Sequence, residues 1–128
     1  RLGRRICPHC RFSYTMPVQE ARHLFLGAAN YFLGTDDIHF YRGKGCEACG
    51  NTGYSSRIGI YELLVVDKDI EQLIIRRAAS TDILLKAREN GMKFLFEDGL
   101  EKVKAGLTTI EELLRIAAPP DVIFFKTP

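Results

Sequence analysis

The sequence predicts an α+β fold in which a small Cys₄ zinc-binding module with short strands is followed by a four-helix cluster. Three observations indicate this class. Two C-x-x-C pairs lie within residues 1–50. Stretches rich in β-forming residues flank the second pair. From residue 67 onward, apolar residues recur at steps of three and four, which is the period of an amphipathic helix.

The bulk composition narrows the classes of function. Of 128 residues, 46% are hydrophobic and 27% are charged, as in ordinary globular proteins. The net charge of +2 falls short of the clustered basic surface typical of nucleic-acid binding. Because there is no run of 18 apolar residues and no signal-peptide pattern, we expect no membrane insertion. The sequence starts at Arg1 rather than Met, so we expect a piece of a longer protein.

Four cysteines are the candidate metal ligands, in the pairs Cys7/Cys10 and Cys46/Cys49, with 35 residues between the pairs. Two residues between thiols let both sulfurs face one point, and four thiolates form a closed tetrahedral Zn²⁺ site. Such a site has no open position and stabilises a fold without catalysing a reaction. Disulfides or unrelated core cysteines are the alternatives. Reduced thiols on a metal favour a cytoplasmic location.

The three histidines and the arginines before Cys7 are not assigned as metal ligands. His9, between the thiols, is expected to be exposed or beside the site rather than a ligand, and His23 and His39 to lie at the surface or core edge. The arginines that precede Cys7 are interpreted as a solvated start of the chain or as contacts to an upstream domain; they are Arg1, Arg4 and Arg5.

The 35 residues between the pairs predict a helix after Pro17 that ends near Gly27, a loop over residues 30–35, and a strand over residues 38–42. The glycine-rich stretch 43–57 is expected to bring backbone amides close to the sulfurs. Residues Ile58–Val66 predict a strand with apolar residues on both faces, buried on both sides, either within this sequence or against a segment outside it.

Four helices are expected after this strand. Asp67 is the expected cap of the first. Ser80, Thr81 or Asp82 caps the second, and Gly91 ends it. The apolar pattern from residue 92 to residue 107 indicates the third, which a glycine at position 99 weakens and one at position 106 ends.

The last helix starts at the capping-box pattern T-I-E-E, residues 109–112, and stops before two prolines at 119 and 120. The carboxylates are interpreted as solvated charges at helix starts and exposed faces; they are Glu62, Glu71, Glu97, Asp98, Glu101, Glu111 and Glu112. The apolar run Val122–Phe125 is expected to pack as a strand or to act as a docking peptide.

No catalytic residues are assigned. The P-loop requires a glycine at position 38 and Ser or Thr at position 45, whereas Ile38 and Gly45 stand there. No set of nucleophile, base and supporting group is recognisable. We therefore expect this chain on its own to be no enzyme.

Three runs in order resemble a known family. They are R-L-x-R-R-I-C-P-H-C at residues 1–10, K-G-C-x-x-C-x-x-T-G-Y-x-x-R-x-G-I-x-E-L-L at residues 44–64, and G-M, D-G-L-x-K-V and G-L-T-T-x-E-E-x-x-R between residues 91 and 115. The chain resembles the C-terminal part of the hexameric ATPases that drive type II secretion and type IV pilus assembly. Gly3, Ser56 and the tail after Pro119 depart from the family's pattern.

The resemblance implies a division into four parts. Residues 1–57 are the tetracysteine zinc-binding module, 58–66 the strand linking to an absent ATPase core, 67–118 the C-terminal helical subdomain, and 119–128 an apolar tail. ATP and Mg²⁺ would bind only in the missing upstream core. Arg57 and Glu62 are candidates for contacts to that core.

The resemblance also implies partners and a location. The partners are the neighbouring subunits of a homo-hexamer and an inner-membrane platform protein, and the location is cytoplasmic, peripheral to the inner membrane. The alternative from another class is a zinc-ribbon module that binds nucleic acid, since zinc ribbons share the double-pair spacing. Charges of both signs are interleaved and few aromatics stand near the pairs, which favours the first interpretation.

Overall fold

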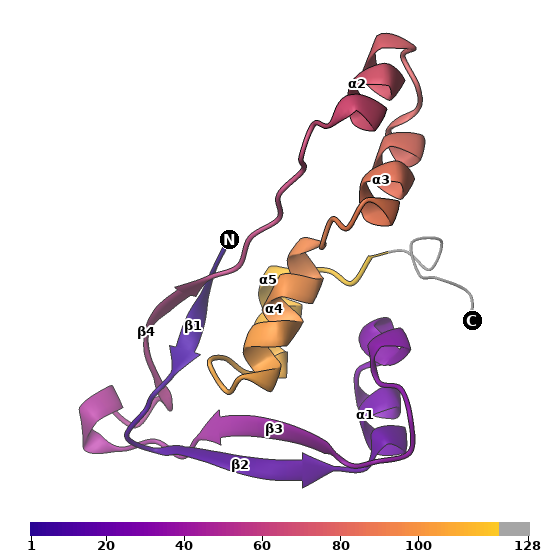
Figure 1. Ribbon diagram of the computed structural model, residues 1–128. Helices are drawn as coiled ribbons and strands as arrows, with labels where there is room; N and C mark the ends of the chain where they lie inside the picture. Colours follow the sequence, from indigo (N-terminus) through magenta and orange to yellow (C-terminus); the bar gives the residue numbers. More distant parts are fainter. Residues whose placement is uncertain (121–128) are drawn as a thin grey trace.

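The computed structural model describes residues 1–120. Four strands form two separate two-stranded antiparallel sheets. Strand β1 (Leu2–Ile6) pairs with β4 (Tyr54–Gly59), and β2 (Arg11–Met16) pairs with β3 (Ile38–Gly43). Each cysteine pair lies where the chain passes from one sheet to the other, so both pairs meet at the junction of the two sheets (Figure 1).

The expected strand at 38–42 is confirmed as β3, whereas β1 and β2 were not expected. Only Gly3 and Ile6 of β1 are buried, so this strand lacks the regular apolar alternation by which strands are recognised. Its partner β4 lies about 50 residues later in the chain, with Arg4 opposite Arg57. Arg4 and Arg5 therefore belong to a strand, and Arg1 directly before it is tied to Ile60 by backbone hydrogen bonds, so the start of the chain is not ragged.

The excursion between the cysteine pairs folds onto one end of the β2–β3 sheet. Helix α1 (Val18–Leu24) starts directly after Pro17, as the sequence predicts. A 3₁₀ helix, η1 (Leu26–Tyr31), follows it, so the helical path continues past Gly27 and takes up the start of the expected loop. A second 3₁₀ helix, η2 (Glu47–Cys49), lies inside the second cysteine pair.

The main core draws on both sides of residue 57. Residues 60–66, which connect β4 to the helices that follow, are called the linker. The buried residues of the core come from α1, η1, β3, the start of the linker and the last two helices, including the residues directly after η1 and α5: Val18, Ala21, Ala28, Phe32, Phe40, Ile60, Phe96, Leu100, Val103, Ile110, Leu113, Ile116 and Ala117. The β2–β3 sheet, the segment between the cysteine pairs and the last two helices thus share one hydrophobic core. The division of the chain at residue 57 stays a prediction.

The predicted strand over Ile58–Val66 is wrong in its bounds, and most of its apolar side chains are not buried by residues 1–120. Strand β4 ends at Gly59, and no strand covers residues 60–66. Tyr61, Leu63 and Val65 are 70%, 74% and 65% exposed. The apolar pattern has the composition of a buried strand, but no further strand among residues 1–120 pairs with it. A strand needs a partner as well as suitable residues.

Four helices follow the linker, as expected, and they pack as two pairs (Figure 1). Helices α2 (Lys68–Ile75) and α3 (Ser80–Glu89) project away from the sheets, whereas α4 (Leu95–Lys104) and α5 (Ile110–Ile116) pack beside them. A Cβ on Gly99 would overlap a methyl group of Leu113, so this glycine lets α4 approach α5 closely instead of merely weakening the helix.

The helix caps follow the sequence in part. Asp67 caps α2, its carboxylate accepting a 3.0 Å hydrogen bond from the amide of Ile70. The expected cap of α3 at residues 80–82 is wrong: the N-cap is Ala79, which has no side chain to offer. Gly91, at φ 102°, follows the end of α3 as expected. The run Val122–Phe125 lies outside the described residues.

Candidate metal centre

The four cysteine sulfurs form one cluster. All four lie within 4.8 Å of one another. The Cys7–Cys46, Cys10–Cys49 and Cys46–Cys49 sulfur separations are 3.8, 3.9 and 3.7 Å. Four sulfurs at about 2.3 Å from a tetrahedral zinc stand about 3.8 Å apart, whereas a disulfide needs about 2.05 Å. The thiols are therefore free, at the spacing that a tetrahedral metal ion requires.

Backbone amides approach the sulfurs at the second pair, as the glycine-rich sequence predicts. The amide of Gly45 donates to the sulfur of Cys10, and the amides of Cys46 and Gly53 donate to that of Cys49, each over 3.3 Å. Gly45 and Gly53 have positive φ angles of 93° and 77°. These turns aim N–H groups at atoms that carry negative charge when a metal is bound.

These surroundings separate the acidities of two thiols. Burial opposes charge on Cys49, but the amides of Cys46 and Gly53 outweigh it and lower its pKa to about 6. At Cys10, burial raises the pKa to about 11, since the amide of Gly45 only partly offsets it and the neighbouring thiols raise it further. One thiol is thus prepared as a thiolate, and a divalent cation is what would hold all four deprotonated.

The donor set fits a structural zinc ion. Four sulfurs occupy the four positions of a tetrahedral site, so no position is left for a substrate or an activated water. His9, His23 and His39 are all exposed. Among residues 1–120, the cluster of candidate metal ligands contains the four cysteines and none of these histidines. What this arrangement can do chemically is hold its two loops together.

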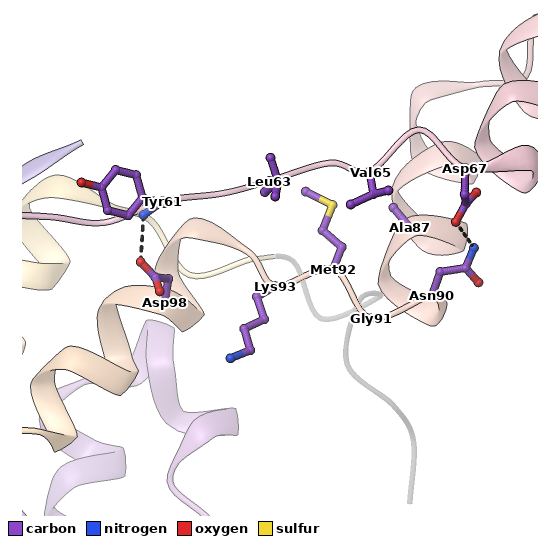
Figure 2. A pocket seen from close by; sticks show the side chains of 10 residues that line it. All are labelled: Tyr61, Leu63, Val65, Asp67, Ala87, Asn90, Gly91, Met92, Lys93 and Asp98. Carbon is purple, nitrogen blue, oxygen red and sulfur yellow. Dashed lines mark hydrogen bonds between the residues drawn. The ribbon is translucent and has the colours of Figure 1, made fainter.

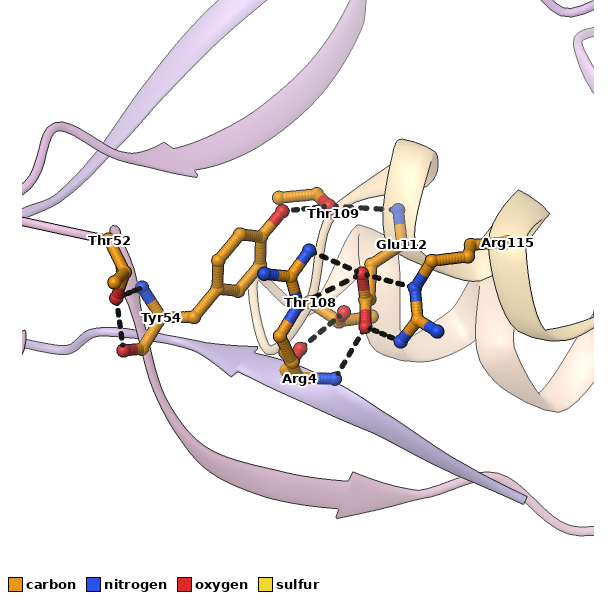
Figure 3. A network of polar contacts seen from close by, with 7 residues as sticks. All are labelled: Arg4, Thr52, Tyr54, Thr108, Thr109, Glu112 and Arg115. Carbon is orange, nitrogen blue, oxygen red and sulfur yellow. Dashed lines mark hydrogen bonds and ion pairs between the residues drawn. The ribbon is translucent and has the colours of Figure 1, made fainter.

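A second polar cluster joins the β1–β4 sheet to the start of α5 and was not foreseen from the sequence (Figure 3). At its centre is Glu112, whose side chain is 1% exposed. The carboxylate accepts hydrogen bonds from the backbone amide of Arg4 over 3.0 Å and from its guanidinium over 3.0 and 3.3 Å. Arg115 also donates to both carboxylate oxygens, at 3.1 Å through Nε to Oε2 and through Nη2 to Oε1.

These partners hold the carboxylate in its charged form. The hydrogen bonds from Arg115 outweigh the opposing effect of burial, and with those from Arg4 they lower the pKa of Glu112 to about 2. The interpretation of Glu112 as a solvated charge is therefore wrong. The capping box is only half formed: Thr109 accepts from the amide of Glu112, but the carboxylate is committed to the arginines.

Further hydrogen bonds extend this cluster to both strands of the β1–β4 sheet. Thr108 donates through its hydroxyl to the carbonyl of Arg4 over 2.8 Å, and the hydroxyls of Tyr54 and Thr109 are 2.8 Å apart. The guanidinium of Arg4 lies 4.2 Å above the ring of Tyr54. We call this set the Glu112 anchor; its members are Arg4, Tyr54, Thr108, Thr109, Glu112 and Arg115.

The two residues suggested as contacts to a missing core are both exposed. Glu62 accepts a 2.8 Å hydrogen bond from the amide of Leu95 and so holds the linker to the start of α4. Arg57 lies opposite Arg4 in the β1–β4 sheet. The structure thus gives Glu62 a role within the described chain and leaves Arg57 at the surface.

A pocket of about 370 Å³ lies between the linker and the α3–α4 connection (Figure 2). Tyr61, Leu63 and Val65 form one wall. The carboxylate of Asp98 in this pocket accepts from the amide of Tyr61 and from Lys102, and that of Asp67 accepts from Asn90. These carboxylates thus serve to fix the linker and the helices.

The aromatic faces of the β2–β3 sheet bear on the nucleic-acid alternative. Arg42 lies 5.1 Å from the ring centre of Tyr14, and Lys44 lies 5.5 Å from that of Phe12. Arg42 also pairs with Glu111. Cations of the chain itself therefore cover these rings, which base stacking would need open.

Comparison with known proteins relates about nine tenths of the chain to one group. The family described as "Type II/IV secretion system protein" matches residues 1–115. The type IV pilus assembly ATPase PilB of Thermus thermophilus is 44% identical over 114 residues, which are 89% of this chain and 12% of that protein.

Two further relatives carry secretion names. The type II secretion system protein HxcR of Pseudomonas aeruginosa is 36% identical over 91% of this chain and 20% of its own length. The type II secretion system ATPase E of Vibrio cholerae is 34% identical over 91% of this chain and 22% of its own length. The chain spans less than a quarter of the length of these relatives.

Proposed function

The chain belongs to the family of type II/IV secretion system proteins, and on this premise we propose that it is the zinc-binding, non-catalytic part of a hexameric motor ATPase. That motor powers type II protein secretion or type IV pilus assembly. Relatives named for both tasks match the chain at 34–44% identity, so the names support the motor class and leave the two tasks open.

One observation carries the metal assignment: four free thiols within 4.8 Å of one another, with sulfur separations that suit a tetrahedral zinc ion. Cys7, Cys10, Cys46 and Cys49 are the proposed ligands. The two loops that carry the cysteine pairs are largely exposed and bury few apolar side chains, so the zinc ion would hold them together in place of a hydrophobic core. Its role is structural because the four ligands close the site.

ATP and Mg²⁺ bind elsewhere in the parent protein in this proposal. The sequence has a single Gly-Lys pair, at residues 43 and 44, and it lacks the other residues of a P-loop. Residues 58–66 link to the ATPase core, where the exposed apolar side chains of the linker would be covered. Arg57, exposed on β4, is the candidate contact to the same core.

The partners follow from the motor class. We propose contacts with neighbouring subunits of a homo-hexamer and with an inner-membrane platform protein, at the cytoplasmic side of the inner membrane. Nucleic acid and direct membrane insertion are not part of the proposal. Within residues 1–120, no helix combines the length and the apolar character that crossing a bilayer requires.

Elemental analysis tests the metal assignment first. The purified protein is expected to contain one zinc per chain, with four reactive thiols that appear only after a chelator removes the metal. A protein without zinc, whether its thiols are free or joined as disulfides, would overturn the assignment.

The mechanical role is tested in the complete ATPase within its secretion or pilus system. Cys46→Ser is expected to remove zinc and to reduce secretion or pilus assembly. Ala48→Ser is the matched control, since Ala48 is exposed in the same loop and the change adds the same hydroxyl group. Normal output from a zinc-free Cys46→Ser protein would contradict the role.

A further inference from the structure

We infer that Glu112 is a positioning residue of the metal centre: it fixes both cysteine loops against α5 and thereby controls how firmly the metal is retained. The inference rests on the proposed zinc occupancy and deepens it. Glu112 touches none of the four sulfurs. Its influence passes through the strands that lead into and out of the cysteine loops.

The burial of Glu112 gives it this capacity. A carboxylate that is 1% exposed needs full compensation, and here two arginines and one backbone amide provide it. The two arginine side chains are about half exposed, at 53% for Arg4 and 57% for Arg115. The carboxylate is thus the buried member on which the other groups depend for their position.

The first cysteine loop is held through β1. Arg4 precedes Cys7 by three residues, and its backbone amide donates to Glu112 while its carbonyl accepts from Thr108. Two residues on, the amide of Ile6 donates to the carbonyl of Leu107 over 2.9 Å. Hydrogen bonds from Arg4 and Ile6 therefore join β1 to residues 107–112, in the segment that leads directly into the first ligand, Cys7.

The second cysteine loop is held through β4. Tyr54 follows Cys49 by five residues, and its hydroxyl is bonded to Thr109, the cap of α5. The amide of Cys7 donates to the carbonyl of Gly53 over 2.9 Å, so the two loops also meet directly. The anchor thus restrains both halves of the ligand set from a single helix end.

Release of the metal requires the two ligand pairs to separate. In the Glu112→Gln variant, an amide NH₂ group replaces one carboxylate oxygen. This group donates hydrogen bonds and cannot accept those that the two arginines donate. Arg4 then loses its buried partner on α5, and the end of β1 that leads into Cys7, where the pairing with β4 is already irregular between Arg4 and Ile6, is held less firmly. The expected consequence is faster loss of zinc, although all four ligands remain.

The test is the rate of zinc transfer from the purified protein to a chromogenic chelator. Glu112→Gln is expected to raise this rate about 10-fold, the lower end for residues that orient metal ligands. Glu111→Gln is the matched control. It makes the same change one residue earlier, at a side chain that is 44% exposed and pairs with Arg42, and its rate is expected to stay within about 2-fold of wild type.

A second control separates positioning from general loss of stability. Val103→Ala removes buried core atoms on α4, outside the anchor, and destabilises the fold without touching β1. If Val103→Ala speeds zinc release as much as Glu112→Gln at equal loss of stability, the positioning role is overturned. Should Glu112→Gln not fold, Tyr54→Phe removes only the hydrogen bond to Thr109, and about a 3-fold faster release is expected.

The outcomes also separate this inference from the proposed function. An unchanged release rate in a zinc-loaded Glu112→Gln protein, or in the Tyr54→Phe protein where it is the variant that folds, overturns the inference alone. A wild-type protein without zinc overturns the proposed metal site and the inference with it.

Discussion

Two glycines in the second cysteine loop offer a matched pair of substitutions, Gly53→Ala and Gly50→Ala. Both residues have left-handed backbone conformations, with φ angles of 77° and 62°. A Cβ on Gly53 would stand 2.6 Å from the carbonyl oxygen of Gly43, whereas a Cβ on Gly50 meets nothing within 4 Å. The two variants share the conformational cost and differ only in the steric one.

The expected magnitudes follow from this difference. Placing alanine in the left-handed region costs about 1–2 kcal/mol in the free energy of unfolding, which applies to both variants. Overlap with the backbone of Gly43 adds about 1–3 kcal/mol for Gly53→Ala. The carbonyl group of Gly43 is part of the paired strand β3, so it cannot rotate away as a side chain can. Gly53→Ala should also disturb the amide bonded to the sulfur of Cys49 and the carbonyl that accepts from Cys7.

Urea unfolding of the zinc-loaded protein, at one fixed concentration of free zinc, measures the difference. Zinc must be fixed because its binding contributes to the apparent stability. With a typical slope for a domain of this size, a difference of about 2 kcal/mol moves the midpoint by about 1 M urea. If the two variants unfold at the same urea concentration, the steric reasoning from the Gly43–Gly53 contact is refuted.

Two further predictions concern a cap and a carboxyl group. Asp67→Ala should lower the free energy of unfolding by about 1 kcal/mol, because Asp67 caps α2. Ser80→Ala should change it by less than about 0.3 kcal/mol, because Ser80 is not the cap of α3. Thermal or chemical unfolding measures both, and an equal loss in the two variants would contradict the assigned caps. The carboxyl carbon of Glu112 should keep its ionised NMR shift as the pH falls from 7 to about 4, and a midpoint near 4.5 would refute the buried pairing. Because its pKa is lowered from 4.5 to about 2, the stability that it supplies is complete above pH 4.5 and declines as the pH falls toward 2.

The features that could be predicted from the sequence are mostly local. The helix after Pro17 and the Asp67 cap depend on residues within a few positions of one another. The gathering of four cysteines spans 35 intervening residues, but it could be predicted because each C-x-x-C pair is a local motif that occurs twice. The α3 cap failed because three capping residues stand together at 80–82, and the helix started at Ser80 itself, which left Ala79 as the cap.

The features that could not be predicted depend on partners far away in the chain. Arg4 and Glu112 are 108 residues apart, and each taken alone has a plausible local interpretation, as a solvated cation and as half of a capping box. The linker failed for the opposite reason. Its apolar residues suit a strand, but pairing is a property of two segments, and only one is present among residues 1–120.

The metal centre and the anchor restrain different relationships. A zinc ion bound by the four cysteines would fix their sulfurs relative to one another, but no residue of α4 or α5 belongs to this cluster. The links from β1 and β4 to residues 107–112 supply that second relationship. In a motor, a displacement of the α4–α5 pair would therefore reach the cysteine loops through these links. Zinc would make the loops respond as one rigid unit, and the contacts of Glu112, together with those of Tyr54 and Ile6, would transmit the displacement to them.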